Sequence, residues 1–148
     1  PSAAGIGPLP RTPPYFCPHP QIINAHHSAM TSVSSGKAGE ERAARFLQAA
    51  GYRILERNYF MRGGEIDIIA SDGNTLVFAE VKTRSYQAFG GPLMAVTPAK
   101  QKRISQTALR YVQEKGLKFD SIRFDVLCVL PEGIEHIKNA FFPPRTTL

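Results

Sequence analysis

Two short segments, residues 65–70 and 76–82, carry acidic side chains at a spacing that could bind a divalent cation. Both are rich in β-branched or aromatic residues, and Gly73-Asn74 between them is a strong signal for a hairpin turn, so we expect two paired β-strands. Because side chains alternate between the faces of a sheet, a two-residue turn puts Asp67 directly opposite Glu80. Like charges opposed across two strands destabilise a sheet, so this pattern indicates a role other than stability.

A lysine and a third acid are expected at the same place. Lys82 follows Glu80 by two residues and therefore lies on the same face of its strand. In the helix predicted before these strands, Glu40 projects close to the apolar side that must face the sheet, whereas Glu41 points toward water. Three acids, Glu40, Asp67 and Glu80, are thus expected to converge with one lysine.

Such a cluster favours a bound cation. Two carboxylates about 5 Å apart repel by about 3 kcal/mol at an effective dielectric constant of roughly 20. Mg²⁺ binds through a few carboxylate oxygens and keeps several waters, which suits Asp67 and Glu80 beside a substrate phosphate. Lys82 would then orient or help deprotonate a water and stabilise charge on the phosphate. The alternative is structural, with a Glu65–Lys82 pair on the surface and Asp67 at a solvated end of the sheet.

The remaining sequence predicts the elements that position these groups. Ser34 or Ser35 caps a first helix that ends at Gly51, and Thr97-Pro98 begins a second helix that stops at Gly116. In chain order the predicted elements are a helix at 36–50, strands at 52–59, 65–70 and 76–82, a helix at 98–115, and strands at 123–130 and 134–137. This order, α-β-β-β-α-β-β, predicts an α/β sandwich with helices flanking a sheet.

The composition is that of a soluble globular protein with one core. The chain has 148 residues, of which 43% are hydrophobic and 20% charged, as expected for one domain. No apolar run approaches the roughly 20 residues needed to span a bilayer, so no membrane partner is expected. Two cysteines cannot build a disulfide framework, and Cys128 lies in the apolar run 126–130. We therefore expect a buried thiol and a cytoplasmic protein.

The first residues differ in composition from the remainder. Seven of the 12 prolines fall within the first 20 residues, and no carboxylate occurs in the first 39. Residues 1–34 are therefore expected to form a disordered Pro-rich extension. For residues 1–29 a translated leader, a cloning remnant and a flexible tail remain open, because Met30 resembles a natural start. The folded domain is expected over residues 35–142, with a C-terminal tail at 143–148.

The charge indicates a polyanionic partner. Lys and Arg number 18 against 12 Asp and Glu, which gives a formal charge of +6, and from Lys82 to Lys118 eight basic residues accompany one acid, Glu114. The expected apolar stripe of the second helix is Ile104, Ala108, Tyr111 and Val112. The candidate nucleic-acid-binding residues are Arg84, Lys100, Lys102, Arg103 and Arg110. A plain solvated face is the alternative, and the loop 89–92 is either a plain turn or a flap over a substrate.

Several motifs resemble known nucleases. Gly64-Glu65-Ile66-Asp67 with Phe78-Ala79-Glu80-Val81-Lys82 resembles the PD-(D/E)xK nuclease motif, with Ile66 in place of the usual proline. Further segments, over about residues 36–142, are similar to the bacterial YraN-like family: Gly39-Glu40, Ala43-Ala44-Arg45-Phe46-Leu47, Arg62-Gly63-Gly64, Ala88-Phe89-Gly90-Gly91, Arg123-Phe124-Asp125-Val126 and Ile137-Lys138-Asn139-Ala140-Phe141. The resemblance implies a restriction-endonuclease-like fold with a central mixed sheet, related to archaeal Holliday-junction resolvases.

The resemblance also implies a chemistry. It makes Asp67, Glu80 and Glu40 the ligands of Mg²⁺ or Mn²⁺ and Lys82 the catalytic lysine of an endonuclease that hydrolyses phosphodiester bonds in DNA by in-line attack of water. A homodimer would suit a cut in both strands. The alternatives are a nucleic-acid-binding adaptor that retains the fold without turnover, and a purely structural protein whose charge is incidental.

Overall fold

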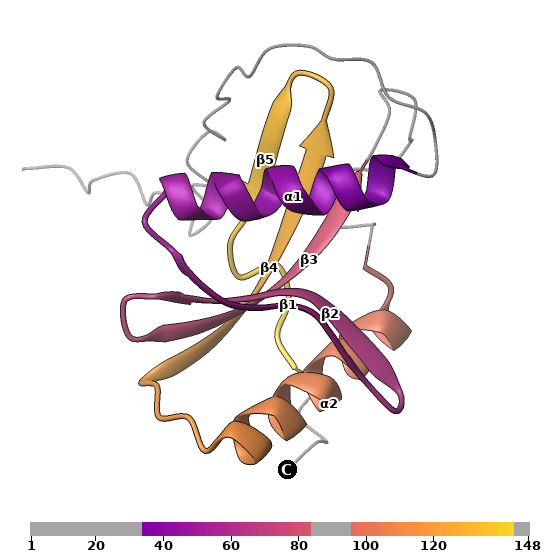
Figure 1. Ribbon diagram of the computed structural model, residues 1–148. Coiled ribbons are helices and arrows are strands. Elements are labelled where there is room, and N and C mark those ends of the chain that lie inside the picture. Colours follow the sequence, from indigo (N-terminus) through magenta and orange to yellow (C-terminus); the bar gives the residue numbers. More distant parts are fainter. Residues whose placement is uncertain (1–33, 84–95, 144–148) are drawn as a thin grey trace, which may run out of the picture.

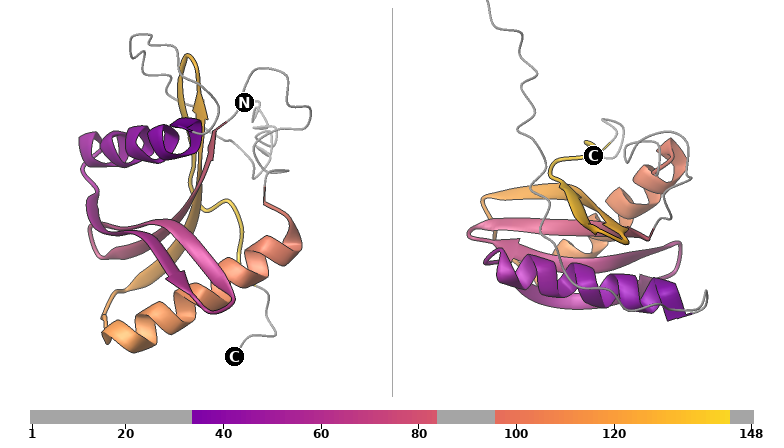
Figure 2. Two further views of the ribbon diagram at one scale, coloured as in Figure 1. Left: turned by 45° about the vertical axis from the view of Figure 1, so that its right-hand side comes forward. Right: turned by 90° about the horizontal axis from the view of Figure 1, so that it is seen from above.

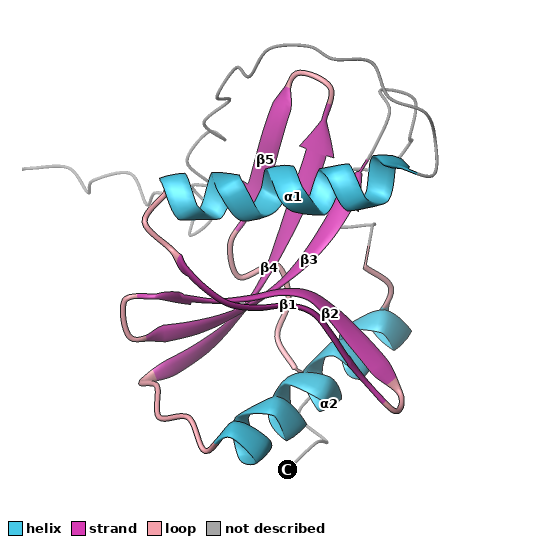
Figure 3. Cartoon of the chain, in the orientation of Figure 1, coloured by secondary structure: helices cyan, strands magenta, loops and turns pink. Residues whose placement is uncertain are grey.

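The structure is a computed structural model that describes residues 34–83 and 96–143 (Figure 1). Its elements are α1 (Ser34–Ala49), β1 (Arg53–Met61), β2 (Gly64–Asp72), β3 (Thr75–Thr83), α2 (Pro98–Lys115), β4 (Ser121–Leu130) and β5 (Gly133–Ile137). The predicted order, α-β-β-β-α-β-β, is confirmed, and every predicted element begins and ends within two residues of the observed one (Figure 3).

The five strands form one mixed sheet in the order β1-β2-β3-β4-β5. All neighbouring pairs are antiparallel except β3 and β4, which are parallel and are joined through α2. Such a parallel pair needs a crossover connection, which places the helix against one face of the sheet. The two helices pack on opposite faces, so the sheet is the middle layer (Figure 2).

The face covered by α1 is built from small and branched side chains. Ala43, Ala44 and Leu47 of the helix pack on strand residues that include Ile68 and Val77. Alternation of the strand side chains puts these residues on the opposite side from the larger aromatic cluster. The predicted amphipathic character of the first helix is thus confirmed.

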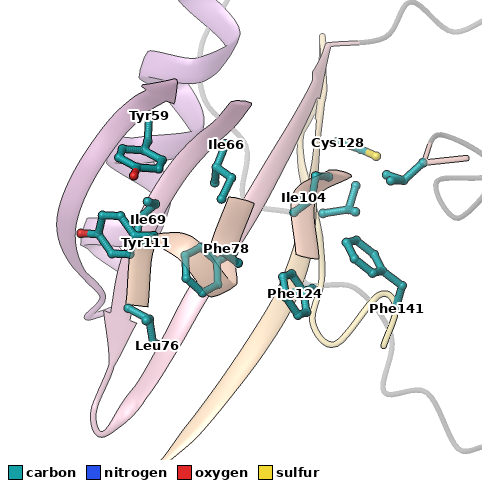
Figure 4. Close-up of a cluster of buried hydrophobic side chains, with 13 residues drawn as sticks. Tyr59, Ile66, Ile69, Leu76, Phe78, Ile104, Tyr111, Phe124, Cys128 and Phe141 are labelled. Carbon is teal, nitrogen blue, oxygen red and sulfur yellow. The ribbon is translucent and has the colours of Figure 1, made fainter. Parts of the chain in front are cut away.

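The face covered by α2 is aromatic. Ile104, Ala108 and Tyr111 of the helix are buried against Phe78 and Phe124 (Figure 4), and Val112 is partly buried beside them. The apolar stripe predicted for this helix is therefore confirmed, as is the buried position of Cys128 in the same cluster.

Local signals fix the ends of α2. The side chain of Thr97 accepts a hydrogen bond from the backbone nitrogen of Lys100 at 3.3 Å, Pro98 is the first helical residue, and Gly116 ends the helix with a left-handed φ of 59°. These are the cap and stop that the sequence predicts.

Some predictions fall outside the described residues. They concern the extension up to residue 33, Arg84, the loop 89–92 and the tail from residue 144. Ser34, which the prediction assigned to the extension, belongs to α1. Within the described ranges, no helix has both the length and the hydropathy that a membrane span requires.

Candidate metal centre

The centre lies where β2 and β3 separate. Their ladder runs from Asp72 paired with Thr75 to Ile68 paired with Ala79. One step further this register brings Asp67 opposite Glu80, as the two-residue turn predicts. Beyond that step β2 turns away from β3, whereas β3 continues beside β4 (Figure 1). The strands therefore form a fork with two carboxylates at its base.

In the fork, the side chain of Asp67 accepts a hydrogen bond from β3 where the backbone ladder between β2 and β3 has ended. The backbone N–H of Val81 donates a hydrogen bond of 2.7 Å to Oδ2 of Asp67. A buried backbone N–H without a partner is unfavourable, so this contact both satisfies β3 and holds the carboxylate in place. This hydrogen bond fixes Oδ2 of Asp67 at the base of the fork.

The alternation of β2 also changes at the fork. Ile66 and Ile69 are three residues apart, yet both pack in the cluster on α2. Strict alternation would put these two residues on opposite faces, and Glu65 would then face α2 in place of Ile66. The Glu65–Lys82 pair of the structural alternative is not what forms, because Glu65 contacts Lys100, with Oε1 3.5 Å from Nζ, and Lys82 contacts Glu80.

The side-chain alternation of β1 also changes beside the fork. Asn58 of β1 has a left-handed φ of 51°. On one side of it Arg57 reaches toward α1 and contacts Glu41 at 2.7 Å, and on the other side Tyr59 packs in the cluster on α2. Residues two apart in a regular strand share a face, so β1 is twisted here. This twist carries β1 and β2 away from β3.

Glu80 is the most buried acid of the centre. Its side chain is 3% exposed, and its Oε1 lies 2.7 Å from Nζ of Lys82 and 3.4 Å from Nζ of Lys100. Its Oε2 is buried and has no hydrogen-bond partner among the described residues. A buried polar oxygen without a partner is unfavourable, so Oε2 of Glu80 is an atom to which a ligand could bind.

The surroundings of Asp67 disfavour its ionised form. Burial, the charge of Glu80 and the charge of Glu40 raise its pKa to about 6, against the lowering effects of the Val81 N–H and of Lys100. Two acids that share a site disfavour each other's charged form. A perturbed carboxyl beside a second buried carboxyl is typical of functional sites, because folding alone gains nothing from it.

Glu40 approaches from the start of α1. Its charge is near enough to Asp67 to raise the pKa of that group, so the predicted convergence of the helical acid is supported electrostatically. Over the described ranges, however, no three Asp, Glu, His or Cys side chains are grouped as a ready set of metal ligands. The structure therefore brings Asp67 and Glu80 together at the fork, and metal ligation by Asp67, Glu80 and Glu40 stays a prediction.

A glycine sets the distance between α1 and β3. Gly39 is buried, and a Cβ built on it would overlap Oγ1 of Thr83. We expect Gly39→Ala to push the start of α1 outward, together with Glu40, and to lower the free energy of unfolding by about 1–3 kcal/mol. Urea denaturation measures this loss. Gly36→Ala is the matched control, because that Cβ meets nothing within 4 Å and alanine favours helix, so equal effects of both variants would contradict the close approach.

The basic residues divide into two groups. Lys100, predicted as a nucleic-acid contact near the site, contacts Glu80 of the centre directly, which the sequence did not predict. Lys102, Arg103 and Arg110 are exposed on the outward side of α2, as predicted. Lys100 thus connects the centre with the helix that carries these exposed basic residues.

A second polar cluster was not predicted. Asp125 is fully buried on the α1 side of β4 and accepts hydrogen bonds from Arg123, from His136 at 2.8 Å and from the backbone N–H of Asn139 at 2.9 Å. Arg123 also donates to Tyr52 at 2.8 Å. The signal in the sequence was the Arg-Phe-Asp spacing, which puts two charges on one face of an otherwise apolar strand. All oxygens of Asp125 are satisfied, so this cluster is structural.

Comparison with known proteins identifies the family. The model of the uncharacterised protein family UPF0102 matches residues 39–129, which include the three acids and the lysine of the predicted centre. A UPF0102 protein of Syntrophus aciditrophicus is 54% identical over 114 residues, covering 74% of this chain and 90% of that protein. For UPF0102 proteins of Geobacter sulfurreducens and Geotalea daltonii the identities are 47% over 122 residues (79% and 92% covered) and 52% over 112 residues (72% and 87% covered). The chain therefore belongs to the UPF0102 family.

Proposed function

We propose that this protein is a metal-dependent nuclease of the PD-(D/E)xK type, which hydrolyses phosphodiester bonds in DNA with Mg²⁺ or Mn²⁺. The observation that carries the proposal is the unpartnered, buried Oε2 of Glu80 beside the carboxyl of Asp67. Under this proposal the protein acts in the cytoplasm, and a homodimer would suit cleavage of both strands.

The donor set fits a hard divalent cation. Asp67 and Glu80 offer carboxylate oxygens, the ligands that Mg²⁺ takes from proteins while it keeps several waters. Oε1 of Glu80 contacts two ammonium groups, whereas Oε2 has no partner, so Glu80 together with Asp67 would hold the ion. When bound, the cation would polarise the phosphodiester and lower the pKa of a water molecule.

The two lysines supply the remaining chemistry. Lys82 is held against Glu80 at 2.7 Å and is one-third exposed, so its ammonium group can donate to a phosphate oxygen or orient the attacking water. Lys100 contacts the same oxygen from α2 at 3.4 Å and adds positive charge where the phosphate develops negative charge. Glu40 can accept a hydrogen bond from a water that approaches in line with the leaving oxygen.

Metal binding and cleavage test the proposal together. We expect calorimetry with Mn²⁺ to detect binding to the wild type and a loss of at least about tenfold in affinity for Asp67→Ala and Glu80→Ala. With Mg²⁺ or Mn²⁺ the wild type should cut at least one member of a panel of branched, flapped, nicked, single-stranded and duplex DNAs, and both variants should cut none. Asp120→Asn, which removes an exposed acid elsewhere, is the control. No metal-dependent cut of any substrate would count against the nuclease.

An adaptor without turnover is the second candidate. Two ammonium groups already contact Oε1 of Glu80, which partly neutralises the acid in the absence of a metal. The adaptor would bind DNA in a salt-sensitive way through the basic face of α2, and Asp67→Ala would leave this binding unchanged. Absence of any binding at low salt would instead favour a purely structural role.

A further inference from the structure

An open pocket adjoins the candidate metal centre. It has a volume of about 390 Å³ and is lined by residues from the end of the β1–β2 hairpin and from the first half of α2. Figure 1 shows the end of this hairpin beside α2. Its walls are Phe60, Gly63, Gly64, Glu65, Lys100 and Arg103. This volume is within the range of pockets that hold small organic groups, and a nucleobase is small enough to enter it.

Lys100 joins the pocket to the metal centre. Its Nζ lies 3.4 Å from Oε1 of Glu80 in the centre and 3.5 Å from Oε1 of Glu65 in the pocket wall. A group that enters the pocket is therefore separated from the two carboxylates of the fork by one side chain. The pocket and the centre would hold neighbouring parts of one ligand.

The hairpin is fixed firmly against the helix at this point. Gly64 leaves no room for a side chain, because an added Cβ would overlap Oγ1 of Thr107 and lie 3.4 Å from the carbonyl oxygen of Arg103. Gly64 pairs with Met61 at the end of the hairpin, one step from the pair of Phe60 with Glu65. The wall that carries Phe60 is thus built on a close backbone contact.

Phe60 is an exposed aromatic residue at the end of the hairpin. Its side chain is 67% exposed, because its neighbours Tyr59 and Met61 point to the other face of the strand and pack in the core. An aromatic ring in a pocket wall beside Lys100 and Arg103 combines a stacking surface with two phosphate-binding cations. Nucleic-acid strands are bound in this way, with bases on aromatic side chains and phosphates on basic ones.

We propose that the pocket binds an unpaired base of a DNA strand, stacked on Phe60, with Arg103 and Lys100 on the adjoining phosphates. The base in the pocket belongs to a nucleotide beside the phosphodiester at the Asp67–Glu80 fork, and this part rests on the proposed nuclease function. A base inside a duplex has both faces covered by its neighbours, so the preferred substrate has a single-stranded segment at the site. Glu65 can accept a hydrogen bond from an amino group of the base.

Binding without metal tests the pocket separately from catalysis. In EDTA, anisotropy of a labelled single-stranded oligonucleotide should show that Phe60→Ala weakens binding about tenfold, while affinity for a blunt duplex of the same sequence changes less than about twofold. Phe60→Trp should retain single-strand affinity, because it keeps a stacking surface. Phe142→Ala is the matched control, since Phe142 is 73% exposed and does not line the pocket. Arg103→Gln should weaken both probes and reduce the salt dependence by about one phosphate contact.

The outcomes separate the two proposals. Equal losses on both probes, or no loss for Phe60→Ala, would overturn base stacking in the pocket while Mn²⁺ binding by the fork stands. A single-strand preference that depends on Phe60, in a protein without Mn²⁺ binding or cleavage, would retain the pocket and overturn the nuclease. Loss of affinity in Phe60→Trp as large as in Phe60→Ala would likewise exclude stacking.

Discussion

Asp67→Asn should unfold at a higher temperature than the wild type near pH 7.5 without divalent cations, although it should lose Mn²⁺ binding and cleavage. Burial and the charge of Glu80 raise the pKa of Asp67 from 3.8 to about 6. A shift of this size corresponds to about 3 kcal/mol of unfavourable ionisation in the folded state. Asparagine removes the charge and keeps an oxygen that can accept from Val81. We therefore expect a gain of about 1–3 kcal/mol, or roughly 5 °C or more.

The raised pKa of Asp67 also predicts how the stability difference between Asp67→Asn and the wild type changes with pH. Because the pKa of Asp67 is higher in the folded state, the folded protein binds more protons between about pH 4 and 6. The free energy of unfolding of the wild type therefore falls as pH rises through this window and stays low above it. The advantage of Asp67→Asn should vanish below about pH 4 and level off above pH 6.

Thermal and urea unfolding in EDTA at several pH values measure this difference. Asp120→Asn provides the control for loss of an exposed carboxylate. If Asp67→Asn were less stable than the wild type at neutral pH, the charge of Asp67 would stabilise the fold. The proposal that a cation must compensate this charge would then be contradicted.

Loss of Asp125 should have the largest effect on folding. Burial opposes its ionisation, but hydrogen bonds from His136, Arg123 and Asn139 outweigh burial and hold the pKa of Asp125 below its usual value. Removing one partner from a buried ion pair typically costs about 3–5 kcal/mol, because the other charge is left uncompensated. Total stabilities of domains are about 5–15 kcal/mol, so Asp125→Ala is expected to lose a large share of the free energy of unfolding.

Two further variants test the role of the buried charge pair even where Asp125→Ala is too unstable to measure. Arg123→Met combined with Asp125→Ala removes both charges, and should recover part of the loss because no unpaired charge stays buried. Asp72→Asn is the matched control: it contacts the same arginine at 3.1 Å from a partly exposed position, and should cost less than about 1 kcal/mol. Urea unfolding of the four proteins gives the comparison. A loss of Asp125 no larger than that of Asp72 would show that the buried cluster is dispensable.

The register of the central hairpin could be predicted because it depends on local chemistry. Gly73 has a left-handed φ of 58°, as a two-residue hairpin turn requires, and the turn length alone fixes which residues face each other. The opposition of Asp67 and Glu80 follows directly from it. The ends of α2 were equally local, since Thr97 and Gly116 are cap residues.

Other parts of the centre depend on contacts between distant elements. The separation of β2 from β3 arises from the twist at Asn58 and from packing of the hairpin on α2. The contact of Lys100 with Glu80 arises from the angle of α2, which no spacing in the sequence encodes. The partners of Asp125 likewise come from three segments, and the left-handed φ of Asn139 that presents its N–H has no clear local signal.

The fork between β2 and β3 divides the sheet into two wings at the level of the centre. Asp67 belongs to the wing that β1 and β2 form, and Glu80 belongs to the wing that β3 forms with β4. A cation bound by both carboxylates would link the two wings at the point where they separate within the described residues. Binding of the ion would then also couple the two halves of the sheet mechanically.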